Sequence, residues 1–322
     1  MNQLQPKSAL AVRPRSPRKP PSRFAQRYGH LWFVLPGLAV FLAFVIYPAL
    51  SAFWLSFFDW RGIGIHYHFI GLANFAEALT SPVLYRAAGN NLVFFIAILV
   101  IQHTLGLLIA VQLNARPRFM QVYRTILFLP VILSLIATGF IWELLLSPNI
   151  GLLNPLLRLI GLGFITHDWL SDVNWALPTV IAVQAWNLLG WAVIIYLAGL
   201  QGIPEELRQA AEIDGANAWQ AFRRVVFPLL APSFSSLTVL TFIQIFRVFD
   251  VVYVLTGPIG APAGRTDVLG TLVYRTAFGV GGNSAMDARM SYAIAISVII
   301  FVIMGLISAL LINLLRRREV EA

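Results

Sequence analysis

The sequence lacks cysteine and has few charged residues. Of its 322 residues, 11% are charged and 58% are hydrophobic. The absence of cysteine excludes structural disulfides, thiol catalysis and cysteine-based metal sites. Long uncharged apolar runs are typical of integral membrane proteins, so we expect one membrane domain rather than two soluble domains.

Motifs for common enzyme chemistry are also missing. The chain has no GxxxxGK[ST] phosphate-binding loop, no HExxH zinc motif and no serine in a nucleophile elbow. We therefore expect no enzyme activity and no cofactor or metal. The net charge of +9 does not indicate nucleic-acid binding, because the basic residues gather in short segments beside the apolar runs.

Six apolar segments are long enough to cross a bilayer as helices. They are 31–58, 92–113, 126–146, 176–200, a helix within 225–255, and 292–315. We interpret the prolines inside them as kinks, because neighbouring helices satisfy the freed backbone groups. The sequence thus predicts an all-α, polytopic membrane protein with six transmembrane helices in a single domain, 31–322.

Basic residues are unevenly distributed between the two sides of the predicted membrane. Most Lys and Arg lie in the tail 1–30, the loops 114–124 and 201–224, and the C-terminus. By the positive-inside rule, both termini are cytoplasmic. The Pro- and Arg-rich tail 1–30 is predicted to be disordered and to orient the chain beside anionic lipid, and it does not resemble a cleavable signal peptide.

The loop between the fourth and fifth predicted helices has an unusual composition. Its stretch "EELRQAAEIDGANAW" (205–219) carries four of the chain's fourteen acidic residues. Read as a helix, 205–226 has one apolar stripe, interrupted by Gly215, which allows a bend. A solvated connector and a lipid-bound helix are the alternatives, but anionic lipid would repel these acids. We therefore predict a cytoplasmic helix that docks onto another protein.

Residues 209–232, "QAAEIDGANAWQAFRRVVFPLLAP", resemble the EAA loop of ABC-importer permeases. That pattern is Glu-Ala-Ala, three residues, Gly, nine residues, then Ile-x-Leu-Pro. Gly215 and Pro228 keep the spacing, whereas Gln209 replaces the first Glu, and Val225 and Phe227 replace Ile and Leu.

Other segments are similar to the maltose- and glycerol-phosphate-type sugar permeases. They are "FIGLANFAEAL" (69–79), "VYRTILFLPVI" (122–132), "PEELRQAAEIDGA" (204–216) and "FDVVYVLTGPIG" (249–260). The resemblance therefore covers nearly the whole chain.

The resemblance implies a multi-pass permease subunit of the bacterial inner membrane. Such a subunit imports a sugar or related polar solute by alternating access, and its implied partners are a second permease, two cytoplasmic ATP-binding subunits and an extracytoplasmic solute-binding protein. The loop 203–228 would insert a coupling helix into the ATPase. The residues implied in that contact are Glu206, Ala210, Ala211, Glu212, Asp214, Gly215, Ala216, Phe222 and Pro228.

Several side chains inside or beside the predicted spans are candidates for the solute pathway, because polar groups in lipid are costly and usually face a bundle interior. Arg247 and Asp250 are placed on one helical face, where they can form an ion pair. An unpaired Arg247 would favour an anionic solute, whereas a paired one would not. Interhelical hydrogen bonding is the alternative role. The candidates are Gln184, Asn187, Gln244, Arg247, Asp250 and Tyr253.

Two other functions remain compatible with the sequence. A membrane scaffold or receptor could use the same cytoplasmic helix to hold a partner without transporting any solute. A secondary transporter would need buried carboxylates coupled to ions, and the sequence has no visible inverted repeat in support of it.

Overall fold

The computed structural model describes residues 31–64, 67–115, 120–281 and 287–316, and these residues are mostly helical. They fall into two units that divide between Ser51 and Ala52. The predicted disordered tail 1–30 lies outside the described residues.

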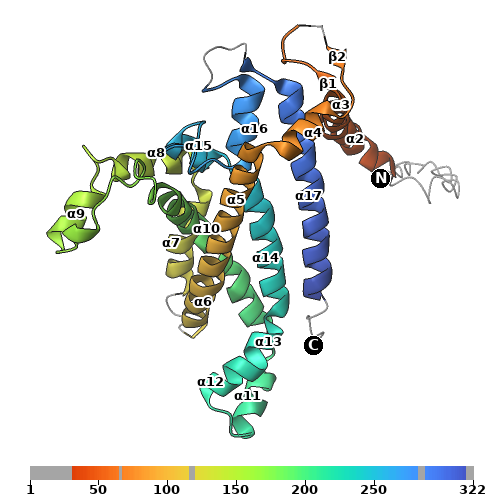
Figure 1. The fold of residues 1–322 in the computed structure, drawn as a ribbon. Helices are drawn as coiled ribbons and strands as arrows, with labels where there is room; N and C mark the ends of the chain where they lie inside the picture. Colours follow the sequence, from red (N-terminus) through yellow and green to blue (C-terminus); the bar gives the residue numbers. More distant parts are fainter. Residues whose placement is uncertain (1–30, 65–66, 116–119, 282–286, 317–322) are drawn as a thin grey trace, which may run out of the picture. The chain divides into compact units, whose positions relative to one another are not determined.

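The first unit contains α2 (Leu31–Phe41), the π-helix η1 (Leu42–Ile46) and the start of α3 (Tyr47–Leu55). The second unit contains all other elements (Figure 1). In chain order these are β1 (Phe58–Asp59), β2 (His68–Phe69), α4 (Ala73–Thr80), α5 (Pro82–Ile101), η2 (Gln102–Gly106), α6 (Leu107–Asn114), α7 (Met120–Ile132), α8 (Leu135–Leu146), α9 (Leu153–Leu159), η4 (Gly163–Ile165), α10 (Ala176–Gly202), α11 (Glu205–Ile213), α12 (Ala218–Ala221), η5 (Phe222–Val226), α13 (Phe227–Leu229), α14 (Ala231–Phe246), α15 (Asp250–Thr256), α16 (Leu269–Phe278) and α17 (Met290–Arg316).

Four helical stretches among the described residues are long and apolar enough to cross a membrane: Phe33–Leu55, Pro82–Asn114, Ala176–Gly202 and Met290–Leu315. Two further pairs qualify only when taken together. Met120–Ile132 with Leu135–Leu146 is bent by 95°, and Ala218–Leu229 with Ala231–Phe246 is bent by 58°. The chain therefore has four such stretches, or up to six if each bent pair is one span.

Helix α10 forms the centre of the second unit and packs against α5, α6, α7 and α14 (Figure 1). Two-thirds of its most apolar stretch is buried inside the chain. Small residues bring its neighbours close: a Cβ added at Gly106 of η2 would lie 2.7 Å from Ala192 Cβ of α10. The two largest core clusters both draw on α10, which explains why its hydrophobicity lacks a helical period.

The third predicted span is divided near Ser134 rather than gently kinked. Pro130 lies inside α7, two residues before this helix ends at Ile132. Its carbonyl accepts a 2.7 Å hydrogen bond from Asn187 Nδ2 of α10. The side-chain amide of another helix thus donates to a backbone carbonyl at the break, and buried carbonyls need such a hydrogen-bond partner.

The fifth predicted helix also ends earlier than expected. Helix α14 ends at Phe246, and α15 begins only at Asp250. The Asn91 side chain of α5 provides a physical reason, because its Nδ2 donates a 2.8 Å hydrogen bond to the carbonyl of Ile245. The same side chain accepts a 2.8 Å bond from the backbone N–H of Leu269. One buried amide therefore joins α5, the end of α14 and the start of α16.

Two side-chain contacts fasten α4 to the rest of the second unit. Buried Asn74 donates hydrogen bonds to the carbonyls of Ser56, at 2.9 Å, and Phe58, at 2.8 Å. Glu77 accepts two bonds from Arg289, at 2.5 and 2.6 Å, just before α17 begins. This pairing lowers the pKa of Glu77 below its usual value, chiefly through the hydrogen bond from Arg289 and despite partial burial.

Candidate functional site

Helix α11 and the short helix α12 form a hairpin at one end of the second unit, opposite to α15 and α16 (Figure 1). The turn between them has a sequence-specific cause. Gly215 has φ +82°, and Ala216 N–H bonds back to the carbonyl of Ala211 at 2.9 Å. This is the Schellman arrangement, which favours glycine at the left-handed position. The bend expected at Gly215 is therefore present.

The second arm of the hairpin begins with a capping box. Asn217 Oδ1 accepts from the backbone N–H of Gln220, and Gln220 Oε1 accepts from the backbone N–H of Asn217, both at 2.9 Å. These reciprocal bonds satisfy donors that the first turn of a helix otherwise leaves free. The hairpin thus carries its own folding signals at both sides of the turn.

Arg208 pairs with two of the four acidic residues in this hairpin. It forms an ion pair with Glu205 on one side and lies 3.8 Å from a Glu212 oxygen on the other. The hydrogen bond from Arg208 lowers the pKa of Glu205. Glu206 and Asp214 form no ion pair among the residues that the structure describes. Their carboxylates are therefore available to a partner.

The most exposed apolar residues of the hairpin flank its turn. Ile213 is 86% exposed and Trp219 is 67% exposed. Sequence reasoning missed both, because neither belongs to the apolar stripe expected along 205–226, which consists of Leu207, Ala211, Ala218, Phe222 and Val225. The sequence signal that could have identified them is a large apolar side chain close to the acidic residues at the tip of the hairpin.

The remaining residues implied in coupling occupy the same hairpin and its base. Ala211, Ala216 and Phe222 are partly buried, whereas Ala210 and Pro228 are exposed. Phe222 lies between the rings of Trp219 and Phe227, with centroids 6.0 and 6.3 Å away. A cavity of about 730 Å³ separates this base from the ends of α6 and α10, and Arg208, Glu205 and Glu212 line it.

The candidate pathway residues fall into two groups. Gln184 and Asn187 of α10 are each only 4% exposed. Asn187 bonds to Pro130, and the Gln184 Oε1 atom has no hydrogen-bond partner among the described residues. Gln244 and Arg247, by contrast, are exposed on α14 and at its end. The structure therefore brings only the second pair to an open surface of this chain.

Of the two alternatives left open for Arg247 and Asp250, the described residues show no ion pair between them. The two residues do not share a helical face, because the chain leaves the helix at Arg247 and reaches φ −145° and ψ −60° at Phe249. The ion pairs among the described residues do not include Arg247 or Asp250. Tyr253 lies one turn into α15, where its ring centroid is 5.1 Å from that of Phe249 and 5.3 Å from that of Tyr274.

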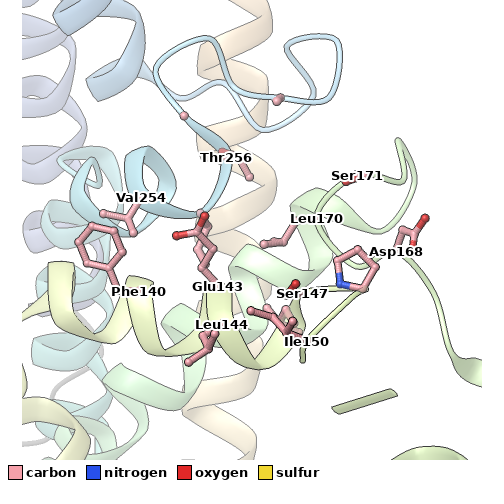
Figure 2. A pocket seen from close by; sticks show the side chains of 15 residues that line it. Phe140, Glu143, Leu144, Ser147, Ile150, Asp168, Leu170, Ser171, Val254 and Thr256 are labelled. Atoms are coloured by element: carbon pink, nitrogen blue, oxygen red, sulfur yellow. The ribbon is translucent and has the colours of Figure 1, made fainter. Parts of the chain in front are cut away.

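A cavity of about 830 Å³ lies between α8, the residues before α10, and α15 with the loop after it. Glu143 of α8 lies in it beneath Val254 and Thr256, while Asp168 lies on another side, beyond Leu170 (Figure 2). Its wall is closely packed where α8 meets α15, since a Cβ added at Gly139 would lie 2.8 Å from Val254 Cβ. The cavity is lined by two carboxylates and by hydroxyl and apolar side chains.

A polar cluster inside the bundle is fully satisfied by its own members. Thr238 donates its hydroxyl proton to the carbonyl of Phe234, at 2.8 Å, so it accepts from His103 Nε2, at 3.1 Å. His103 Nδ1 is then the acceptor for the Tyr196 hydroxyl. His103 is thus a neutral, interhelical packing residue that joins α10 and α14.

Comparison with known proteins shows the family. Residues 102–320 match the family described as "Binding-protein-dependent transport system inner membrane component". The chain is 35% identical to the probable ABC transporter permease protein YurN of Bacillus subtilis over 84% of this chain and 90% of YurN. It is 32% identical to the lactose transport system permease protein LacF of Rhizobium radiobacter over 83% of this chain and 89% of LacF.

A solved structure has the same architecture. It is a bacterial ABC transporter involved in the import of the acidic polysaccharide alginate. The two chains are 26% identical, with a TM-score of 0.76, over 91% of this chain and 97% of the other. These matches favour the importer permease over the scaffold and the secondary transporter. With its helices, its exposed hairpin and its relatives in agreement, the chain belongs to the binding-protein-dependent transport system inner membrane components and is the non-enzymatic permease subunit of an ABC importer.

Proposed function

We propose that this chain forms, with a second homologous permease, the membrane pathway for a sugar or related polar solute. Relatives are named for neutral and acidic carbohydrates: LacF for lactose, and the solved transporter for alginate. A solute-binding protein on the outer side and two ATP-binding subunits in the cytoplasm complete the proposed importer. A solved structure of an alginate ABC transporter in complex with a periplasmic protein carrying an alginate pentasaccharide supports the first of these partners.

The proposed topology has six spans, with each bent pair counted as one. Both termini and the hairpin then lie in the cytoplasm, as the basic residues of 114–124 and 201–224 favour. Residues 1–30 form a cytoplasmic tail in this arrangement, and 31–322 form the membrane domain in a bacterial inner membrane.

The hairpin within 203–228 is the proposed coupling element between this permease and an ATP-binding subunit. The observation that carries this proposal is an exposed hairpin with two exposed apolar side chains, Ile213 and Trp219, beside its turn. Asp214 at the turn and Glu206 at the start of α11 form no ion pair within the described part of the chain. Burying an isoleucine contributes about 1.5–3 kcal/mol. A basic rim around the partner's groove would complement Glu206 and Asp214.

Gln209 stands where the family pattern has Glu, so another carboxylate would have to make the charged contact. Because Arg208 engages Glu205 and Glu212, we assign the charged contact with the ATPase to Glu206 and Asp214. Ala210, Ala211 and Ala216 would allow close approach, while Phe222 and Pro228 support the base of the hairpin.

Solute would pass along the open face of α14, which presents Gln244 and Arg247. Asp250 and Tyr253 continue this path on α15. Gln184 and Asn187 would support the pathway from behind, because both are buried inside the chain.

Co-purification tests the coupling proposal. Glu206→Lys should reduce the ATPase recovered with the permease pair by roughly tenfold, the effect of a lost charged contact. Gly215→Val should reduce it as well, because valine does not readily adopt the φ of +82° at this turn. ATP-dependent uptake should fall in parallel. Gln201→Lys adds a lysine at the end of α10, outside the hairpin, and should change neither. Normal recovery and uptake in both hairpin variants would contradict the proposal.

A further inference from the structure

A groove of about 600 Å³ runs between the end of α14, the start of α16 and the middle of α17. Arg247 contributes its only charge among the described lining residues. The other groups used below are Gly270 of α16 and Ser297, Phe301, Gly305 and Ser308 of α17.

This groove lies at membrane depth. Helix α17 has 27 residues, about 40 Å at 1.5 Å per residue. Its groove-lining positions, from Ser297 to Ser308, begin seven residues after its first residue and end eight residues before its last. They therefore occupy the part of α17 that crosses the hydrocarbon core, which is about 30 Å thick.

Arg247 has no anionic partner within the described part of the chain. Asp250 is separated from it by the break between α14 and α15. Asp267, near the start of α16, is already bound by Arg275 at 2.5 Å. Glu143 and Asp168 line a different cavity, beside α8.

An arginine at this depth needs a compensating anion or water, because an unpaired charge in the bilayer is costly. A guanidinium binds carboxylate and phosphate groups through paired hydrogen bonds. Ser297 and Ser308 add side-chain hydroxyl groups to the groove, and Phe301 is 77% exposed. Phe301 offers an aromatic face to the C–H surface of a sugar ring.

We propose that this groove binds the carboxylate or phosphate of an acidic sugar or phosphorylated polyol, with Arg247 as the group that recognises the charge. This inference rests on the proposed transport function and selects its solute class. Gly305 leaves the groove open, since a Cβ added there would meet no atom within 4 Å. Gly270 instead allows close packing, because a Cβ added there would lie 2.6 Å from the Val248 carbonyl oxygen.

Uptake into proteoliposomes that contain the complete importer with its binding protein tests this proposal. The anionic probes are radiolabelled digalacturonate for a carboxylate and glycerol 3-phosphate for a phosphate. Digalactose and glycerol are the neutral counterparts. We expect ATP-dependent uptake of one anionic probe, in preference to its neutral counterpart.

Variants at Arg247 identify the group responsible. Arg247→Gln should lower uptake of that anionic probe by roughly 10- to 100-fold, the effect of losing one charged hydrogen bond. Arg247→Lys should retain a larger share, because it keeps the charge. Arg158→Gln removes an exposed arginine from α9 and should leave uptake within twofold.

Other outcomes would overturn the inference. If only the neutral probes are taken up, and Arg247→Gln does not change that uptake, then the proposed acidic solute is wrong but the importer function is not contradicted. Loss of the second permease from the purified Arg247→Gln complex would show instead that Arg247 pairs with a carboxylate of that subunit. Absence of ATP-dependent uptake of every probe would contradict the proposed function as well.

Discussion

Replacing Asn187 by leucine should separate a structural from a solute-binding role. Asn187 Nδ2 donates to the Pro130 carbonyl at 2.7 Å, and both residues are buried. In the variant, that carbonyl keeps only the N–H of Leu133, at 3.3 Å. An unmade buried hydrogen bond costs about 1–3 kcal/mol, so the break between α7 and α8 should lose that much stability.

The assay combines unfolding of the purified protein in detergent with solute uptake by the reconstituted importer. We expect Asn187→Leu to unfold more readily, with the KM for the transported solute within twofold of wild type. Gln201→Leu is the matched control, because it removes an exposed amide from the same helix and should cost less than about 0.5 kcal/mol. A KM raised tenfold with unchanged stability would refute the reasoning and make Asn187 a solute contact.

Two further predictions concern stability. Glu77→Gln should destabilise the protein by about 0.2–1 kcal/mol at pH 7, the range for exposed ion pairs. Because the folded-state pKa of Glu77 is lowered, this contribution is present above its unfolded pKa and is lost as pH falls through the folded one, so the difference between the two proteins should shrink progressively on acidification below the ordinary pKa of glutamate. Gly190→Ala should cost about 1–3 kcal/mol in thermal unfolding, since its Cβ would clash with the Leu127 carbonyl oxygen. Gly202→Ala, with open space around it, should be neutral or stabilising; equal effects of the two alanines would contradict the packing of α10 on α7.

The helical class and the bend of the hairpin were predictable from local sequence signals. Long apolar runs indicate helices regardless of their neighbours, and Gly215 marks the only residue type that readily adopts φ +82°. The four straight candidate spans accordingly overlap four of the predicted ones.

The helix breaks were not predictable, because their causes are distant in sequence. Asn91 reaches Ile245 across 154 positions, and Asn187 reaches Pro130 across 57. A helical period alone therefore extended the fifth span past Phe246. The same extension placed Arg247 and Asp250 on one helical face, which the break between α14 and α15 separates.

Sequence periodicity also could not separate buried from open candidates on the pathway. Gln184 and Asn187 are polar residues in an apolar helix, as is Gln244. Only packing shows that α10 is enclosed by its neighbours while α14 leaves one face open. Residue type identified these candidates, and only the tertiary contacts show which of them are buried and which are exposed.

Cross-linking from the tip of the hairpin tests the coupling claim most directly. Since the chain has no cysteine, Ile213→Cys introduces a unique thiol that can carry a benzophenone photo-cross-linker. In inverted membrane vesicles that contain the whole active importer, we predict a cross-linked product with the ATP-binding subunit. Ile160→Cys, exposed after α9 on the predicted outer side, should give none. Cross-linking of Ile213→Cys to lipid alone, in vesicles that still transport, would contradict the account.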